Sequence, residues 1–173
     1  MIKFLKYFLL IVGSIIIIFL LLGVFMPKQH YEISMEIDAP VEKTFAMFND
    51  TSIMSKWMPS LKSIKNISGN AGEVGSKWKI TFLDHGKEIE MTETITEFKT
   101  NESFSFNIQN EVMNSDNSFR FIPDGNKTRV ETSCTYSGGN IFWKSLFVFI
   151  NSSVKKQQTT QFEALKKMIE NSP

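Results

Sequence analysis

The stretch Val130-Glu-Thr-Ser-Cys-Thr-Tyr-Ser-Gly-Gly139 contains the last predicted strand of the chain and the break that follows it. Every second side chain is expected to point inward and the side chains between them are polar, which is the pattern of a strand with one buried face. The inward residues are Val130, Thr132, Cys134 and Tyr136. Gly138 and Gly139 end the strand. The next residues, 141 to about 170, predict one long helix, whose second half has apolar residues at helical spacing and lysines opposite them.

The same alternation recurs upstream of this stretch, in segments that short turns connect. Asp84-His-Gly86, Thr100-Asn-Glu102 and Asp124-Gly-Asn126 provide three of these turns. Turns of this length cannot hold crossover helices, so the strands are expected to be antiparallel. An earlier strand, 31–37, is followed by two predicted short helices, 41–48 and 51–57. We therefore predict an α+β domain in which about six further strands form a twisted antiparallel sheet around the C-terminal helix.

The N-terminal segment predicts a transmembrane helix. Tyr7 to Met26 carries no charge, and as a helix it spans about 30 Å, the thickness of a hydrocarbon core. It is longer than the apolar part of a signal peptide, about 7–15 residues, and has no small-x-small cleavage site, so an uncleaved single-pass anchor is favoured. Lys3 and Lys6 precede it and Lys28 follows it. This bias predicts a cytoplasmic N-terminus and a domain on the outer, periplasmic or extracytoplasmic face.

The predicted organisation is an anchor with a short tail at 1–27 and one globular domain at 28–173. The domain is long enough to bury a core without disulfides, and Cys134 is the single cysteine. Hydrophobic residues make up 42% of the chain, with 16 Phe and 9 Met. A core of this composition is bulky but adaptable, since Met fills irregular space.

Several classes of function find no support in the sequence. Only two of the basic residues are arginines and none cluster, so no nucleic-acid partner is expected. His30 and His85 have no partner at metal-ligand spacing, and the glycine-rich segment 69–75 lacks the Gly-Lys-Ser/Thr of a phosphate loop. Gly-x-Ser-x-Gly is absent as well. We therefore predict no metal, no cofactor and no assigned catalytic residue.

Motifs spread along the domain carry a family resemblance. They are Ile37-Asp-Ala-Pro40 with Val41-x-x-x-Phe45, Trp57-Met-Pro59, Gly72-Glu-Val-Gly75-Ser-Lys-Trp78 and Leu165-Lys-Lys-Met-Ile-Glu170. In this order they resemble the START/Bet v 1-like superfamily (SRPBCC), also called the polyketide cyclase/dehydrase and lipid-transport family. The resemblance covers roughly residues 30–170. It implies a helix-grip fold, a curved antiparallel sheet wrapped around the long C-terminal helix, with a hydrophobic cavity between them.

Strand alternation nominates residues for the lining of such a cavity, and Trp57 could stand at its mouth. The alternative is that these side chains simply fill the core, because large inward side chains usually pack solid. The nominated residues are Trp57, Trp78, Phe82, Met91, Phe104, Phe106, Phe119, Phe121, Thr132 and Tyr136. Thr132 could orient a ligand through its hydroxyl group, or bond to a neighbouring strand.

Glu93 has two possible positions. Strict alternation from Ile89 and Met91 turns it into the cavity, where burial would raise its pKa and make it a candidate acid or base. The same alternation would turn Glu97 inward and Phe98 outward. A β-bulge after Met91 would instead return both glutamates to water, and this interpretation is the favoured one.

The start of the C-terminal helix, 141–150, is apolar on nearly all sides. It is either buried on several sides, or its aromatic residues include some that touch the bilayer beside the anchor. The aromatic residues concerned are Phe142, Trp143, Phe147 and Phe149.

Three functions remain open. The first is a membrane-tethered module that binds or transfers a lipid or another hydrophobic small molecule in its cavity, with the bilayer as a partner. The second is a cyclase- or hydrolase-type enzyme acting on an apolar substrate, in which Glu93 moves protons beside Thr132 and Tyr136. The third is a protein-interaction scaffold with a filled cavity.

Overall fold

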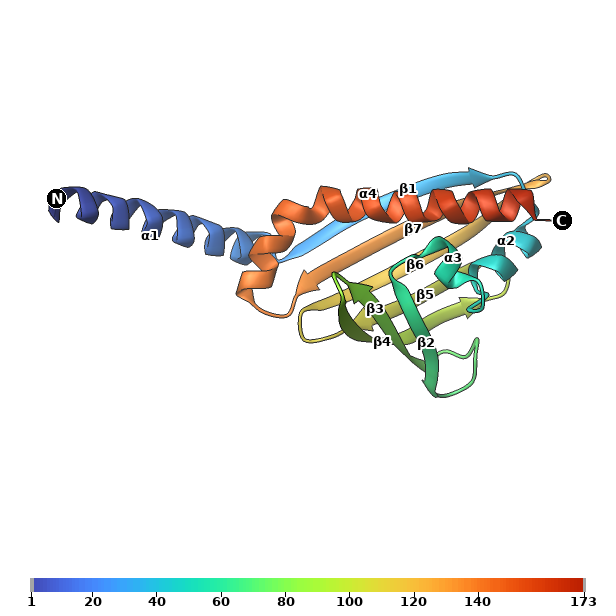
Figure 1. Ribbon diagram of the computed structural model, residues 1–173. Helices are drawn as coiled ribbons and strands as arrows, with labels where there is room; N and C mark the ends of the chain where they lie inside the picture. Colours follow the sequence, from blue (N-terminus) through green and yellow to red (C-terminus); the bar gives the residue numbers. More distant parts are fainter. Residues whose placement is uncertain (1, 173) are drawn as a thin grey trace.

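The computed structural model describes residues 2–172, apart from the side chain of Ile2. One seven-stranded antiparallel sheet curves around a long C-terminal helix, and a separate helix leaves the domain at the N-terminus (Figure 1). In chain order the elements are α1 (Ile2–Phe25), β1 (Lys28–Ile37), α2 (Val41–Phe48), α3 (Met54–Trp57), β2 (Leu61–Ser68), β3 (Lys77–Asp84), β4 (Lys87–Lys99), β5 (Ser103–Gln109), β6 (Met113–Asp124), β7 (Lys127–Gly138) and α4 (Ile141–Asn171).

The strand order is β1-β7-β6-β5-β4-β3-β2, so all neighbours except β1 and β7 are consecutive in sequence. β1 pairs with β7 along its whole length, from Lys28 opposite Ser137 to Ile37 opposite Thr128. The predicted α+β helix-grip architecture is confirmed, with six strands after the first. The second short helix is shorter than the predicted 51–57, because its helical part begins only at Met54.

The break between β7 and α4 is fixed by backbone contacts. The Gly139 N–H donates to the carbonyl of Val112 at 2.8 Å, and any side chain on Gly139 would collide with the carbonyl of Glu111. Asn140 then caps α4, since its side-chain oxygen accepts a hydrogen bond from the Trp143 N–H at 3.2 Å. The chain can therefore turn from the sheet edge directly into the helix that covers the sheet.

The core lies between the C-terminal half of α4, α2 and the concave face of the sheet. Ile169 is fully buried and Leu165 is nearly so. The Phe121 ring of β6 lies 5.0 Å from the Phe45 ring and 5.3 Å from the Phe48 ring. These edge-to-face arrangements are favourable for aromatic rings, so the phenylalanines build one continuous core around Phe48.

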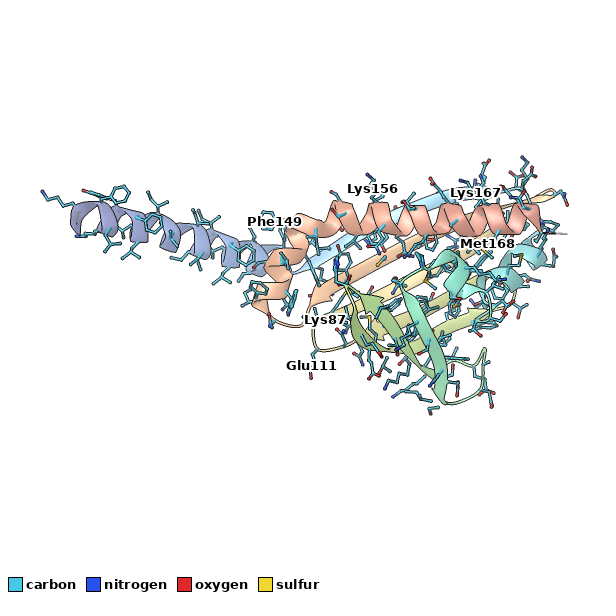
Figure 2. All side chains as sticks on the ribbon, in the orientation of Figure 1. Lys87, Glu111, Phe149, Lys156, Lys167 and Met168 are labelled. Atoms are coloured by element: carbon cyan, nitrogen blue, oxygen red, sulfur yellow. The ribbon has the colours of Figure 1, made fainter. Side chains whose placement is uncertain are left out.

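α1 projects away from the domain, and its side chains point outward (Figure 2). Residues 3–25 are long and apolar enough to cross a membrane, although a signal sequence would have the same character. The last turns of α1 pack against the start of α4. A Cβ at Gly23 would overlap Ser145, and the Phe19 ring lies 5.8 Å from the Phe142 ring. Small residues at the crossing allow the two helices to come this close.

Phe121 provides a test of this core. Phe121→Ala should lower the free energy of unfolding by about 3–5 kcal/mol, because it leaves a cavity among rings that have little room to collapse. Urea unfolding of the full chain in a neutral detergent would measure this loss. Phe142→Ala is the control, since Phe142 is 51% exposed, and it should cost less than about 1 kcal/mol. Equal losses in the two variants would contradict the described core.

Candidate functional site

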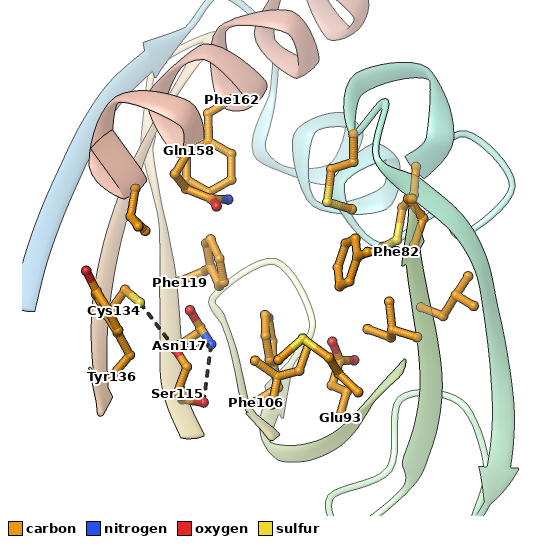
Figure 3. A pocket seen from close by; sticks show the side chains of 18 of the residues that line it. Phe82, Glu93, Phe106, Ser115, Asn117, Phe119, Cys134, Tyr136, Gln158 and Phe162 are labelled. Atoms are coloured by element: carbon orange, nitrogen blue, oxygen red, sulfur yellow. Dashed lines mark hydrogen bonds between the residues drawn. The ribbon is translucent and has the colours of Figure 1, made fainter. Parts of the chain in front are cut away.

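A cavity of about 230 Å³ lies between α4 and the concave face of the sheet. Its walls come from β1, α2, α3, α4 and the strands β2 to β7, and they are mainly aromatic, aliphatic and methionine side chains. Figure 3 shows α4 above one wall and the β2–β3 side of the sheet at the opposite wall. The cavity is therefore enclosed by the domain itself and is separate from α1.

The inward face of α4 explains why space remains here. The helix buries Phe147 near its start and Phe162, Leu165 and Ile169 near its end. Between them, at the same helical spacing, stand Asn151, Val154 and Gln158. Val154 and Gln158 line the cavity. Because these side chains are smaller or more polar than those on either side, the middle of α4 does not fill the concave face of the sheet.

The structure brings most of the nominated residues into the cavity wall. The wall contains Trp57, Phe82, Met91, Glu93, Phe104, Phe106, Phe119 and Tyr136. Phe121 lies outside it because α2 covers that part of the sheet, where Phe121 packs on Phe45 and Phe48.

Two other nominated residues also lie outside the wall. Thr132 is buried where α4 packs on β1 and β7, between Ile33 and Phe119. Trp78 is partly buried against the core. The Thr132 hydroxyl is thus not placed to orient a ligand in this cavity.

β4 contains the predicted irregularity, but at a different position. Met91, Glu93 and Ile95 are all buried, and the register shifts only between Ile95 and Glu97. The favoured interpretation, a bulge after Met91 that exposes Glu93, is therefore wrong for Glu93 and right for Glu97. Because the register shifts only after Ile95, Glu93 is buried whereas Glu97 lies on the outer face.

Glu97 lies on the outer face of the sheet. It accepts a hydrogen bond from the Ser103 hydroxyl at 3.0 Å and pairs with Lys99 at 2.9 Å. These hydrogen bonds and the Lys99 charge lower the Glu97 pKa. Phe98, the next residue, turns inward and packs on Phe45 and Phe104.

Glu93 is 8% exposed and lines the cavity. Its cross-strand neighbours are Trp78 on β3 and Ile108 on β5. Within residues 2–172 no side chain or backbone group forms a hydrogen bond or ion pair with its carboxylate. Burial raises the Glu93 pKa to about 7, because water is not available to solvate the charged form.

A neutral polar group lies on β6, on the same face of the sheet as Glu93 and with only β5 between them (Figure 3). Asn117 Nδ2 donates to the Ser115 hydroxyl at 3.1 Å, and the Ser115 oxygen lies 3.4 Å from the Cys134 sulfur. Burial raises the pKa of the Cys134 thiol. Ser115 and Asn117 were not nominated from the sequence, although they share the inward register of Phe119 and Phe121. Residues 114–118 are all polar, so the sequence did not mark them as part of a strand, whereas β6 begins at Met113.

Two tyrosines complete the titratable groups in the cavity wall. The Tyr136 hydroxyl donates to Asn151 Oδ1 at 2.9 Å, and burial raises its pKa to about 12. Burial also raises the pKa of Tyr31. Both phenols and the thiol therefore stay neutral near pH 7. Glu93 is the one group in the described cavity wall that titrates there.

The aromatic residues at the start of α4 divide into two sets. Phe149 and Phe142 are exposed and lie against Phe19 of α1, where Figure 2 labels Phe149. Trp143 is partly buried. Phe147 differs from the prediction of membrane contact, since it is 7% exposed and its ring packs 5.4 Å from the Tyr136 ring. It faces the sheet, where a bilayer has no access.

Among residues 2–172 there is no group of three or more His, Cys, Asp or Glu side chains that could hold a metal ion. The outer-face glutamates Glu88 and Glu90 pair with Lys62 and Lys79. They thus serve the cross-strand charge pairing expected of a wet sheet face.

Comparisons with known proteins give one family match. The model of the family described as polyketide cyclase/dehydrase and lipid transport matches residues 28–170. No curated protein matches the sequence.

Solved structures share the fold at low sequence identity. Ara h 8.0201 has 16% identity and a TM-score of 0.68, over 84% of this chain and 99% of that one. The Zhui aromatase/cyclase from Streptomyces sp. R1128 has 10% identity and a TM-score of 0.69, over 83% and 94%. Norcoclaurine synthase from Thalictrum flavum, in complex with dopamine and hydroxybenzaldehyde, has 13% identity and a TM-score of 0.61, over 84% and 89%.

The raised pKa of Glu93 predicts a pH-dependent cost in stability. Between pH 4.5 and about 7 the folded chain holds the Glu93 proton and the unfolded chain does not, so stability falls as pH rises through this window. The loss reaches about 3 kcal/mol above pH 7. Glu93→Gln should therefore stabilise the chain by this order at pH 8 and have little effect at pH 4.5, as measured by chemical denaturation.

Glu97→Gln is the matched control, because Glu97 lies four residues further along the same strand and on the outer face of the sheet. Its carboxylate has a lowered pKa and forms stabilising contacts, so this substitution should not stabilise the chain at pH 8. A Glu93→Gln effect that is the same at both pH values would show that the carboxyl group is not buried without a partner.

Proposed function

Because the chain belongs to the polyketide cyclase/dehydrase and lipid transport family, we propose that it binds a small hydrophobic molecule in the cavity beneath α4 while α1 holds it at a membrane. The family membership confirms the resemblance drawn from the motifs. The observation that carries the proposal is the cavity itself, lined mainly by apolar side chains from nearly every element of the domain. A protein-interaction scaffold with a filled cavity has no such space, so this alternative is not favoured.

The size of the cavity limits the ligand. An engineered apolar cavity of about 150 Å³ is large enough to hold benzene, and drug-sized ligands occupy pockets of about 300–1,000 Å³. At about 230 Å³ the space suits one or two rings or a short chain. A two-chain lipid would require α4 or α3 to move away from the sheet. We therefore propose a compact apolar molecule, and not a complete phospholipid, as the ligand.

The proposed membrane location rests on α1 and on the exposed aromatic residues beside it. Only Met26 and Pro27 separate α1 from β1, so an anchored domain would stay close to the bilayer. Phe142 and Phe149 lie beside Phe19, six residues before the end of α1. A bilayer that surrounds α1 would therefore reach these two rings, and a ligand dissolved in it would be near the domain.

A second candidate function is an enzyme of the cyclase type, and Glu93 is the observation that favours it. A carboxyl group with a pKa near 7 inside an apolar cavity can donate and accept a proton near neutral pH. Incubation of the purified chain with an extract of apolar metabolites would then consume one compound and produce another. Glu93→Gln should abolish this conversion and retain binding, whereas a pure binding protein would leave the extract unchanged.

Filling the cavity tests the binding proposal. Val154→Trp places a large side chain in the space beneath α4, so it should weaken the binding of a fluorescent apolar probe by at least about tenfold without destabilising the domain. Lys156→Trp is the control, because Lys156 lies on the exposed face of the same helix (Figure 2). Native mass spectrometry should also show an apolar molecule retained by the wild-type chain and lost from Val154→Trp. Equal probe binding by both variants would exclude this cavity as the site.

Topology can be tested with a single surface cysteine. Lys87 is the first residue of β4, directly after the β3–β4 turn, and is exposed, whereas Cys134 is buried. Lys87→Cys in intact bacterial cells should react with a membrane-impermeant maleimide if the domain lies outside. The chain should also remain in the membrane after alkaline carbonate extraction, and removal of residues 1–26 should release it. Labelling only after cell lysis would reverse the proposed orientation.

A further inference from the structure

The cavity contains one acidic group and no basic group to balance it. Glu93 is more than nine-tenths buried and lines the space beneath α4. No Lys, Arg or His belongs to the cavity wall. A buried carboxyl group without a partner destabilises the folded chain. Glu93 stands in the inward register between the buried residues Met91 and Ile95, and a buried carboxyl group in this position indicates that its partner is supplied from outside the chain.

The surroundings of Glu93 suit a positive charge. The rings of Phe82, Phe104, Phe106 and Phe119 belong to the same cavity wall, and aromatic faces attract ammonium groups. A carboxylate ligand would meet a like charge at Glu93, and it would find no cation to pair with. A neutral alcohol would leave the charge of ionised Glu93 uncompensated.

We propose that the cavity ligand is a small lipophilic amine whose nitrogen pairs with the Glu93 carboxylate while its apolar part fills the space beneath α4. This inference rests on the proposed function of the cavity and names the chemical class of its ligand. The volume of about 230 Å³ limits the apolar part to one or two rings or a short chain. The Ser115–Asn117 pair on β6, which only β5 separates from β4, can accept or donate one further hydrogen bond.

Entry of such a ligand need not bury a net charge. The neutral form of an amine dissolves in a bilayer and can enter the apolar cavity. The Glu93 carboxyl group then transfers its proton to the amine nitrogen, which gives an ammonium ion beside a carboxylate. The pair replaces a neutral acid and a neutral base, and its attraction in a low-dielectric site offsets the lost hydration of both ions.

The protonation of Glu93 makes ligand binding depend on pH. The other titratable groups in the wall are Tyr31 and Tyr136 with the Cys134 thiol, and each stays neutral near pH 7. An aliphatic amine has a pKa of about 10, like that of lysine, so it is protonated in water throughout this range. Its affinity should therefore fall as the pH is lowered through about 7, where Glu93 takes up its proton.

Two probes of equal size separate charge from apolar burial. 3-Phenylpropylamine and 3-phenylpropan-1-ol would be titrated against the full chain in a neutral detergent, with tryptophan fluorescence as the readout because Trp57, one of the three tryptophans, lines the cavity. Titrations of micelles without protein correct for partitioning of the probes. Glu93→Gln removes the charge and keeps the shape, and Glu90→Gln on the outer face of the same strand is the control.

At pH 8 the wild-type chain and Glu90→Gln should bind the amine at least about tenfold more tightly than the alcohol. Glu93→Gln should bind both probes within about twofold of the alcohol affinity of the wild type, which also shows that its cavity is intact. At pH 5 the wild-type preference should largely disappear.

Equal wild-type affinities for the two probes, or an amine preference that persists in Glu93→Gln, would overturn this inference and leave the apolar cavity standing. Binding of neither probe by any variant would overturn the proposed function together with it.

Discussion

The packing of α4 against the concave face of the sheet is the interaction on which the rest of the structure depends. Phe162, Leu165 and Ile169 at one end and Phe147 at the other fix the height of the helix above the strands. The side chains between these two contacts, Val154 and Gln158, are too small or too polar to reach the opposite wall. The cavity is thus the consequence of two firm contacts with a weaker stretch between them. The contacts at the two ends of α4 therefore determine the volume of the cavity.

Much of this architecture was predictable from the sequence because it depends on periodicity. The two-residue alternation of the strands, the short turns and the spacing of α4 give the antiparallel sheet and its covering helix directly. The same alternation placed Phe82, Met91, Phe106 and Phe119 on the inner face. It could not separate cavity wall from solid core, because that difference depends on which helix lies above each residue. Phe121 and Thr132 have the inward register, but α2 and α4 cover them.

The position of the β4 bulge could not be predicted for a different reason. A bulge reverses the register of every residue after it, so the predicted bulge after Met91 and the observed shift after Ile95 both agree with the exposure of Glu97. A bulge after Met91 avoids burying any carboxylate, so local energetics favour it. The structure instead keeps Ile95 inside, where a bulge after Met91 would have turned it outward, and Glu93 is buried as a result. Burial of one large apolar side chain, which contributes about 1.5–3 kcal/mol, can offset the cost of burying one protonated carboxyl group. Ser115 and Asn117 were missed because the all-polar stretch 114–118 has no apolar alternation to mark it as a strand.

The contact between α1 and α4 links the N-terminal helix to the cavity through a single helix. Gly23 and Ser145 allow close approach, and Phe19 stacks between Phe142 and Phe149. Within two turns of that contact, the same helix directs Phe147 to Tyr136 and Asn151 to the Tyr136 hydroxyl. Tyr136 in turn lines the cavity. A displacement of α1 relative to the domain would therefore shift the start of α4, and with it one wall of the cavity, before it disturbed the core at the far end of the helix. On this argument the position of the N-terminal helix bears on the shape of the cavity.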